Sequence, residues 1–112
     1  MIAVFDKEES LRACLASILE IDFNLIPKQK NDKFENDINE FLIKEHGIFM
    51  APCSFNFRKN NNIKYFNSTF LIGFKKNHSV IIYKNDIIHD PIINSNLKFD
   101  EIEECYLLLK YF

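Results

Sequence analysis

The hydrophobic residues change their spacing halfway along the chain, and this change constrains the fold more than any other feature. In residues 10–21 and again in 34–46, apolar residues three and four positions apart predict amphipathic helices, the second ended by Gly47. The second half instead carries short apolar runs bounded by turn residues, which is typical of strands. Helices followed by an antiparallel sheet form the α+β pattern. We therefore expect an α+β fold whose N-terminal helix packs on an antiparallel sheet of four to six strands.

The strand boundaries follow from Gly, Pro, Asn and Asp residues between the apolar runs. A two-residue turn at Asn85-Asp86 would join the third and fourth strands, and counting back across it pairs Ile81 with Asp90. Residues 22–33, which include Pro27, form a loop. The predicted strands are 48–58, 65–74, 78–84, 87–90 and 102–111, and the phenylalanine-rich segments 55–57, 66–74 and 106–112 should supply much of the core.

The chain has 112 residues, which is the size of one ordinary domain spanning 1–112. Hydrophobic residues make up 47% of it, enough to build a core and to exclude disorder as a first expectation. The formal charge of −2 gives no electrostatic reason to expect nucleic acid or an anionic membrane as a partner. No apolar run approaches the length of a membrane span, and the N-terminus does not read as a signal peptide.

Three cysteines, at positions 14, 53 and 105, form an odd set that cannot close into a fully paired disulfide framework. Such a set is typical of reduced, mostly buried thiols, so we expect a cytoplasmic protein. There is no C-x-x-C and no clustered Cys/His spacing, so the sequence predicts neither a metal site nor a cofactor.

A hydroxyl and a thiol stand at the start of the first predicted helix. Ser10 opens the helix and Cys14 follows one turn later. The positive end of a helix dipole lowers a thiol pKa and stabilises an oxyanion, so either residue is a candidate nucleophile. The alternatives are plain structural roles, an N-cap for Ser10 and a small buried core residue for Cys14.

A histidine and a carboxylate occupy the ends of two neighbouring predicted strands. His78 begins one strand and is a candidate general base, while Asp90 ends the next strand within His89-Asp90-Pro91 and could orient the imidazole. The alternatives are a surface histidine after a turn and an ordinary strand terminator before proline. None of these signals is specific by itself.

Taken together, these segments resemble one known family. The segment 10–21 followed by Ile26-Pro27, the segment 37–47, and the strands 70–73, 78–83 and Ile88-His89-Asp90-Pro91 resemble the small papain-like cysteine peptidases of bacteria and phages. Their layout is related to that of double-glycine leader peptidases. The resemblance covers almost the whole chain in the right order, and the His strand with the His-Asp-Pro strand is its most specific part.

The resemblance implies a papain-like α+β fold and a Cys-His-Asp hydrolase, a peptidase or amidase acting on a peptide or protein through an acyl-enzyme. In that family His78 would be the base, Asp90 would fix its tautomer, and no cofactor is used. The nucleophile position, however, carries Ser10, and the chain has no Gln before Gln29 to serve as the family's oxyanion-hole side chain.

Several explanations of Ser10 remain open. Ser10 replaces a native cysteine, or the chain is a natural pseudo-hydrolase that keeps the fold and acts as a peptide- or protein-binding module. A working serine nucleophile and a substitute nucleophile at Cys14 are weaker alternatives, and a small structural subunit without a groove is the plainest one. The sequence does not specify the substrate, the partner or the oligomeric state.

Overall fold

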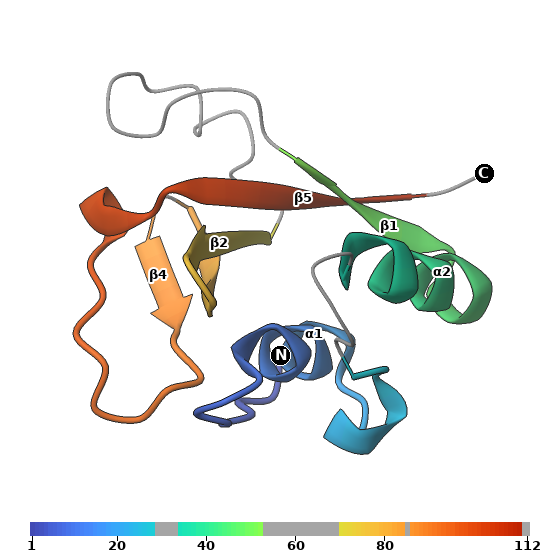
Figure 1. Cartoon of the computed structure of the whole chain (residues 1–112), viewed down its shortest axis with the longest axis horizontal. Helices are drawn as coiled ribbons and strands as arrows, with labels where there is room; N and C mark the ends of the chain where they lie inside the picture. The colour runs from blue at the N-terminus through green and yellow to red at the C-terminus, as the bar shows by residue number, and fades with distance from the viewer. Residues whose placement is uncertain (29–33, 53–69, 85, 111–112) are drawn as a thin grey trace.

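The computed structural model describes residues 1–28, 34–52, 70–84 and 86–110, and for 34–36 only the backbone. Within these ranges two α-helices, two short 3-10 helices and five strands follow one another along the chain (Figure 1). The helical elements are α1 (Ser10–Leu19), η1 (Phe23–Leu25), α2 (Phe34–His46) and η3 (Phe99–Glu101). The strands are β1 (Ile48–Pro52), β2 (Leu71–Lys75), β3 (His78–Tyr83), β4 (Asp86–His89) and β5 (Glu104–Lys110).

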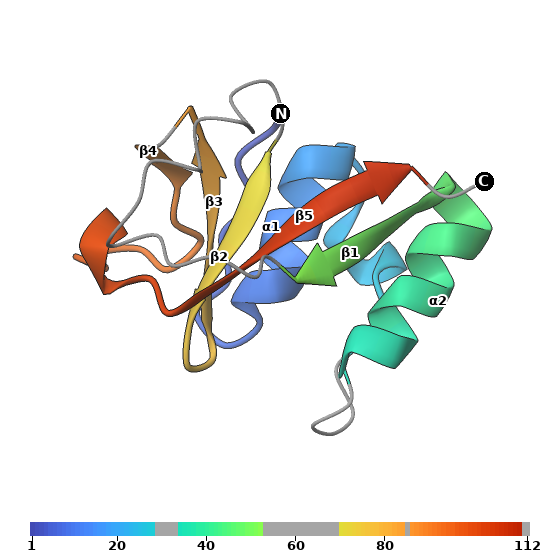
Figure 2. The same cartoon turned by 90° about the horizontal axis from the view of Figure 1, so that it is seen from above.

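The five strands form one antiparallel sheet in the order β1-β5-β2-β3-β4 (Figure 2). The last strand, β5, therefore lies between β1 and β2 and links β1 to the β2–β3 hairpin within the sheet. The predicted α+β class is confirmed.

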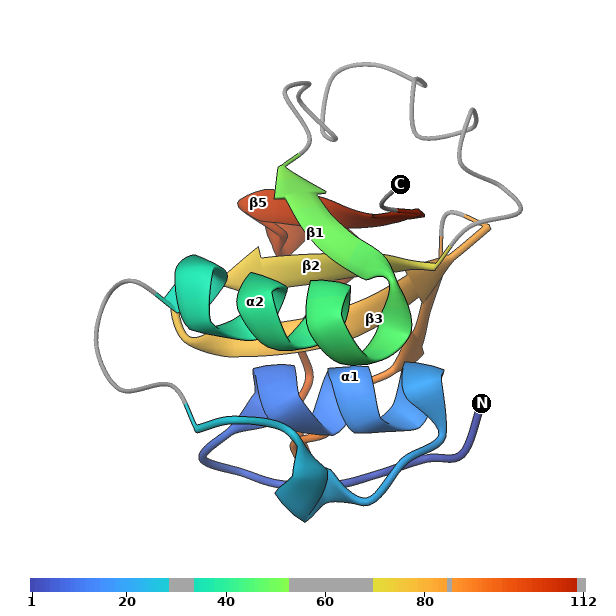
Figure 3. The ribbon, with the colours of Figure 1, turned by 90° about the vertical axis from the view of Figure 1, so that its right-hand side faces the viewer.

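Both helices lie on one face of the sheet (Figures 1 and 3). α1 packs against β3, and α2 packs against β1. The core between them is largely aliphatic, with Leu15, Ile38 and Leu42 from the helices facing Ile72 and Ile81 from the sheet. This packing brings the first turn of α1 to the end of β3 at which His78 stands.

The opposite face of β2 and β3 is also buried, against the chain between β4 and β5. Leu71, Val80 and Ile82 pack there with Ile102. Burial on both faces explains why these two strands are almost continuously apolar instead of alternating. A Cβ added at Gly73 would lie 2.8 Å from Ile82 Cδ1, so a larger residue there would have to displace the buried Ile82 side chain.

Arg12 anchors α1 to the residues that follow it. The residue is only 4% exposed, and its side chain donates from Nε to the Ile26 carbonyl at 2.8 Å and from Nη2 to the Phe23 carbonyl at 3.1 Å. A third bond joins Nη1 to Glu9 at 2.8 Å, and the guanidinium stacks 4.2 Å from the centre of the Phe23 ring. A buried charge with this many partners holds the direction in which α1 starts.

Several predicted boundaries need correction. The first helix ends at Leu19 instead of Ile21, because Glu20 takes a left-handed conformation with φ 57°. The second helix ends as predicted, with Gly47 at φ 64°. The strand predicted at 48–58 ends at Pro52 within the described residues, and the remainder, including the phenylalanines at 55–57, lies outside them, as do 65–69.

The β3–β4 hairpin differs from the predicted register. Tyr83 pairs with Asp86, so Asp86 begins β4 instead of belonging to the turn. A bulge between Ile81 and Ile82 then pairs Ile81 with His89, and the predicted pairing of Ile81 with Asp90 is wrong. Asp90 is thereby left one residue beyond β4.

Candidate functional site

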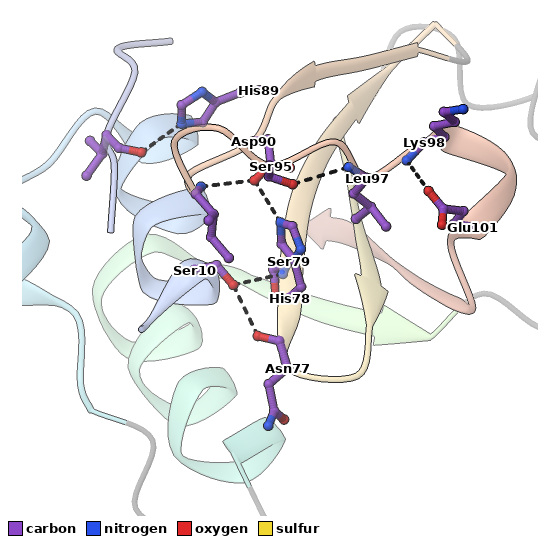
Figure 4. Close-up of polar contacts among 12 residues, drawn as sticks. Ser10, Asn77, His78, Ser79, His89, Asp90, Ser95, Leu97, Lys98 and Glu101 are labelled. Carbon is purple, nitrogen blue, oxygen red and sulfur yellow. Dashed lines mark hydrogen bonds and ion pairs between the residues drawn. The ribbon is translucent and has the colours of Figure 1, made fainter. Parts of the chain in front are cut away.

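Ser10 joins the start of α1 to the start of β3. Its hydroxyl donates to the Asn77 carbonyl at 3.2 Å and accepts the Ser79 N–H at 2.8 Å, and the residue is 2% exposed. These two backbone groups flank His78, so the hydroxyl spans the backbone on both sides of that residue (Figure 4). The predicted role as N-cap is wrong, because the N-cap is Glu9 and Ser10 is already the first helical residue.

His78 and Asp90 form the pair that the sequence predicts. His78 Nε2 lies 2.7 Å from Asp90 Oδ1, with 21% of the histidine and 18% of the aspartate side chain exposed. An ionised carboxylate only accepts hydrogen bonds, so Nε2 carries the hydrogen, and when the ring has a single hydrogen its lone pair is on Nδ1. This is the arrangement in which a carboxylate orients an imidazole for proton transfer.

The Asp90 carboxylate is held ionised by its surroundings. Burial raises the pKa of Asp90, but hydrogen bonds from Ser95, His78 and the Ile92 N–H outweigh burial, so that the pKa lies below its ordinary value. The Ile92 N–H reaches Oδ1 at 2.9 Å. At neutral pH the carboxylate is therefore a charged acceptor for His78.

The structure brings Ser10 to the backbone on both sides of His78 but gives its hydroxyl no hydrogen bond to the imidazole. A hydroxyl has one hydrogen, and in Ser10 that hydrogen is donated to the Asn77 carbonyl. A nucleophile must pass this proton to its base. In this arrangement Ser10 is a buried structural clamp.

Cys14 does not replace Ser10 as a nucleophile. The residue is fully buried, and burial together with the negative charge of Asp90 raises the pKa of its thiol well above the ordinary value. Cys14 is a free thiol, as expected, but Cys105 is disulfide-bonded, so the prediction of reduced thiols is wrong there. Cys53 lies outside the described residues.

Two further residues brace the site, and the sequence analysis did not assign them a role. Asp6 accepts the Glu8 and Glu9 N–H groups at 2.9 and 2.7 Å, which lowers its pKa, and its own N–H donates to the Pro91 carbonyl at 3.0 Å. His89 is 8% exposed, and its Nε2 lies 2.7 Å from the Val4 carbonyl. The sequence offers a local signal for Asp6, because an aspartate shortly before a helix commonly accepts nearby backbone N–H groups. It offers no such signal for the bond of His89, whose partner is distant in sequence.

The surroundings do not suggest a metal centre. Among the residues that the structure describes, no three His, Cys, Asp or Glu side chains are grouped to hold a metal ion. A surface hollow of about 320 Å³ lies elsewhere, beside α2, and includes neither His78 nor Asp90. It is lined by Pro27, Lys28, Asp37, Glu40, Phe41, Lys44 and Glu45.

Comparison with known proteins does not assign the chain to a family. No family model, no curated protein and no solved structure matches the chain. Within the described part of the chain, no helix is long and apolar enough to cross a membrane.

Proposed function

We propose that this chain is a papain-like hydrolase fold with a Cys-His-Asp type site in which Ser10 stands at the nucleophile position and the covalent step is absent. In this reading the protein is a pseudo-hydrolase that binds a peptide or another protein beside His78. The proposal rests on one observation above all, the engagement of the Ser10 hydroxyl by the backbone of Asn77 and Ser79.

Three aspects of the arrangement support the papain-like part of the proposal. A helix beginning at position 10 packs on the strand that begins with His78, and the next strand is followed directly by Asp90. The His–Asp distance of 2.7 Å is that of a charge-assisted hydrogen bond. The remaining nitrogen, Nδ1, is the one left for a nucleophile or a ligand.

Two properties of Ser10 support the absence of catalysis. With 2% exposure, the hydroxyl is closed to a substrate carbonyl, which must come within about 3 Å of a nucleophile. A serine hydroxyl is also far less acidic than a thiol and needs an adjacent base, whereas its proton here is held by a carbonyl. Ser10 therefore serves the fold, and the partly exposed His78–Asp90 pair is what remains available for recognition.

A thiol hydrolase is the second candidate, because the His78–Asp90 pair keeps the geometry of a working base. A native cysteine codon at position 10 of the natural gene would favour it over the pseudo-hydrolase. A cytoplasmic location stays a prediction of the sequence, and the disulfide at Cys105 does not support it.

Covalent labelling tests the proposal. The chain with Ser10 is treated with a fluorophosphonate, and Ser10→Cys with a thiol-directed epoxide, each with and without His78→Ala; peptide mass spectrometry then separates residue 10 from Cys14. We expect no adduct on Ser10, because its hydroxyl is buried and engaged by the backbone. An adduct on Ser10 would contradict the pseudo-hydrolase. A His78-dependent adduct on Ser10→Cys would favour the thiol hydrolase, and an unreactive Ser10→Cys that cleaves no library peptide would exclude it.

Binding is tested separately with a displayed peptide library. Peptides selected on the protein are synthesised and their affinities measured by calorimetry. We expect His78→Ala to weaken binding about tenfold or more, as for a central contact, and Lys84→Ala, an exposed position at the far end of β3, to leave it unchanged. Failure to select any peptide that depends on His78 would contradict the binding function.

A further inference from the structure

Asp90 stands one residue beyond the sheet, so the strand register does not orient its carboxylate. β4 ends at His89, and Asp90 Oδ1 nevertheless lies 2.7 Å from His78 Nε2 (Figure 4). The same oxygen accepts the Ile92 N–H at 2.9 Å. That N–H belongs to the peptide unit between Pro91 and Ile92 (the 91–92 peptide), so the orientation of this unit governs where the oxygen is held.

The 91–92 peptide is also held from its other side. A trans peptide is planar, and its C=O and N–H point in opposite directions. While the N–H faces Asp90, the Pro91 carbonyl accepts the Asp6 N–H at 3.0 Å. Pro91 has little freedom of its own, because its ring fixes φ and is almost fully buried. The remaining freedom is rotation of the peptide unit itself, which would break both hydrogen bonds at once.

The Asp6 side chain fixes the segment that makes this contact. Its Oδ1 accepts the Glu8 and Glu9 N–H groups at 2.9 and 2.7 Å, which closes a turn directly before α1. Glu9 is joined to the buried Arg12 by an ion pair of 2.8 Å. An alanine at position 6 would keep the backbone N–H but lose the turn that directs it at Pro91.

We infer that Asp6 is a positioning residue, which holds the 91–92 peptide and through it keeps the Asp90 carboxylate against His78. A continuous path of hydrogen bonds runs from the Asp6 N–H through this peptide to Asp90 Oδ1 and on to the imidazole. The path favours the imidazole tautomer with hydrogen on Nε2. The value of this tautomer for recognition rests on the proposed function, whereas the path of bonds does not.

Nitrogen-15 NMR of the His78 ring tests the inference without any peptide or nucleophile. Four proteins are compared: the unaltered chain, Asp6→Ala, Asp6→Asn as the variant that keeps an acceptor oxygen, and Lys7→Ala as an exposed neighbour in the same segment. We expect Asp6→Ala to raise the ratio of the Nδ1–H to the Nε2–H tautomer about threefold or more, the effect of weakening one hydrogen bond. Asp6→Asn and Lys7→Ala should keep the original ratio.

Hydrogen exchange of the Ile92 amide provides the second measurement. In Asp6→Ala its rate should rise about threefold or more relative to that of Val80, a buried amide of β3 that reports on the stability of the whole fold. A purely structural role of Asp6 would raise both rates together. An equal rise of the two rates would therefore overturn the inference.

The tautomer ratio gives the other decisive outcomes. If the turn at 90–92 holds its own shape, the ratio in Asp6→Ala stays unchanged, and the inference is wrong. An equal change in Lys7→Ala or Asp6→Asn would also overturn it. If Asp6→Ala does not fold, the unaltered chain decides: a scalar coupling across the hydrogen bond from the Asp6 nitrogen to the Pro91 carbonyl carbon supports the inference, and its absence overturns it. None of these outcomes depends on labelling at position 10, so failure of the proposed function is recognised separately.

Discussion

Replacement of Ser10 by alanine removes one oxygen atom and should destabilise the fold. That oxygen accepts the buried Ser79 N–H at 2.8 Å and donates to the Asn77 carbonyl at 3.2 Å. Alanine leaves both groups without this partner, in a position that is 2% exposed. The expected effect is on stability, because the hydroxyl makes no bond to the His78 ring.

The magnitude follows from the two bonds. An unsatisfied buried N–H costs about 1–3 kcal/mol, and the longer bond to a partly buried carbonyl adds about 0.5–1 kcal/mol. We expect Ser10→Ala to lower the free energy of unfolding by about 1.5–4 kcal/mol. With an unfolding entropy of about 2.1 cal/mol/K per residue over 112 residues, the melting temperature should fall by about 6–17 °C.

Urea unfolding followed by circular dichroism measures this loss, and an unchanged m-value confirms that the unfolded states are comparable. Asn77→Ala is the matched control, since only the backbone carbonyl of that exposed residue takes part in the bond; its effect should stay within about 0.5 kcal/mol. A loss of less than about 0.5 kcal/mol in Ser10→Ala would refute the clamp and reopen the possibility that the hydroxyl is free for chemistry.

Three further predictions concern buried or ionised groups of the same fold. Cys14 should resist a disulfide reagent in the native protein at pH 8 and react at once in urea, because burial keeps the thiol protonated; rapid native labelling would contradict this. The pKa of Asp90 is lowered in the folded state, so its stabilising contribution is present above the ordinary aspartate pKa of about 3.9 and is lost as the pH falls through the folded value. Asp90→Asn should therefore unfold at lower urea concentration than the unaltered chain at pH 7, with a difference that shrinks below about pH 4, whereas a constant difference would argue against an ionised Asp90. Gly73→Ala should lower the free energy of unfolding, measured in urea, by about 1–3 kcal/mol, because its Cβ would lie 2.8 Å from Ile82 Cδ1. Gly47→Ala provides a comparison without such a contact, since the strain there comes only from the left-handed backbone with φ 64°.

The sequence predicted the helices, and the order of helices and strands along the chain, better than the residues at which each element begins and ends. Periodic apolar residues placed α1 and α2 correctly to within two residues at each end, because the hydrophobic face of a helix is a local pattern. The β3–β4 register was wrong because Tyr83 pairs with Asp86, a residue that the sequence analysis placed in the turn, and because a bulge between Ile81 and Ile82 then shifts the pairing again. Of the segments predicted to supply the core, the described parts contribute Leu71, Ile72, Phe74 and Tyr106, whereas residues 55–57, 66–69 and 111–112 lie outside the described residues.

The candidate site likewise has one part that the sequence predicts and one part that it does not. Two residues at the ends of neighbouring strands, His78 and Asp90, could be paired from the sequence because hairpin topology brings such ends together even when the register shifts by one residue. Their surroundings could not be predicted, since the bond from the Ile92 N–H to Asp90 depends on the path of the loop after β4. The role of Ser10 was open for the same reason.

By itself, the sequence determined the α+β class, the presence of two helices before the sheet and which histidine faces which carboxylate, because these follow from local periodicity and from the short connection between adjacent strands. Only the tertiary structure decided what Ser10 does. Its hydroxyl meets Asn77 and Ser79, 67 and 69 residues away along the chain, and a donor or acceptor so distant in sequence becomes a neighbour only when the packing of α1 on β3 is complete.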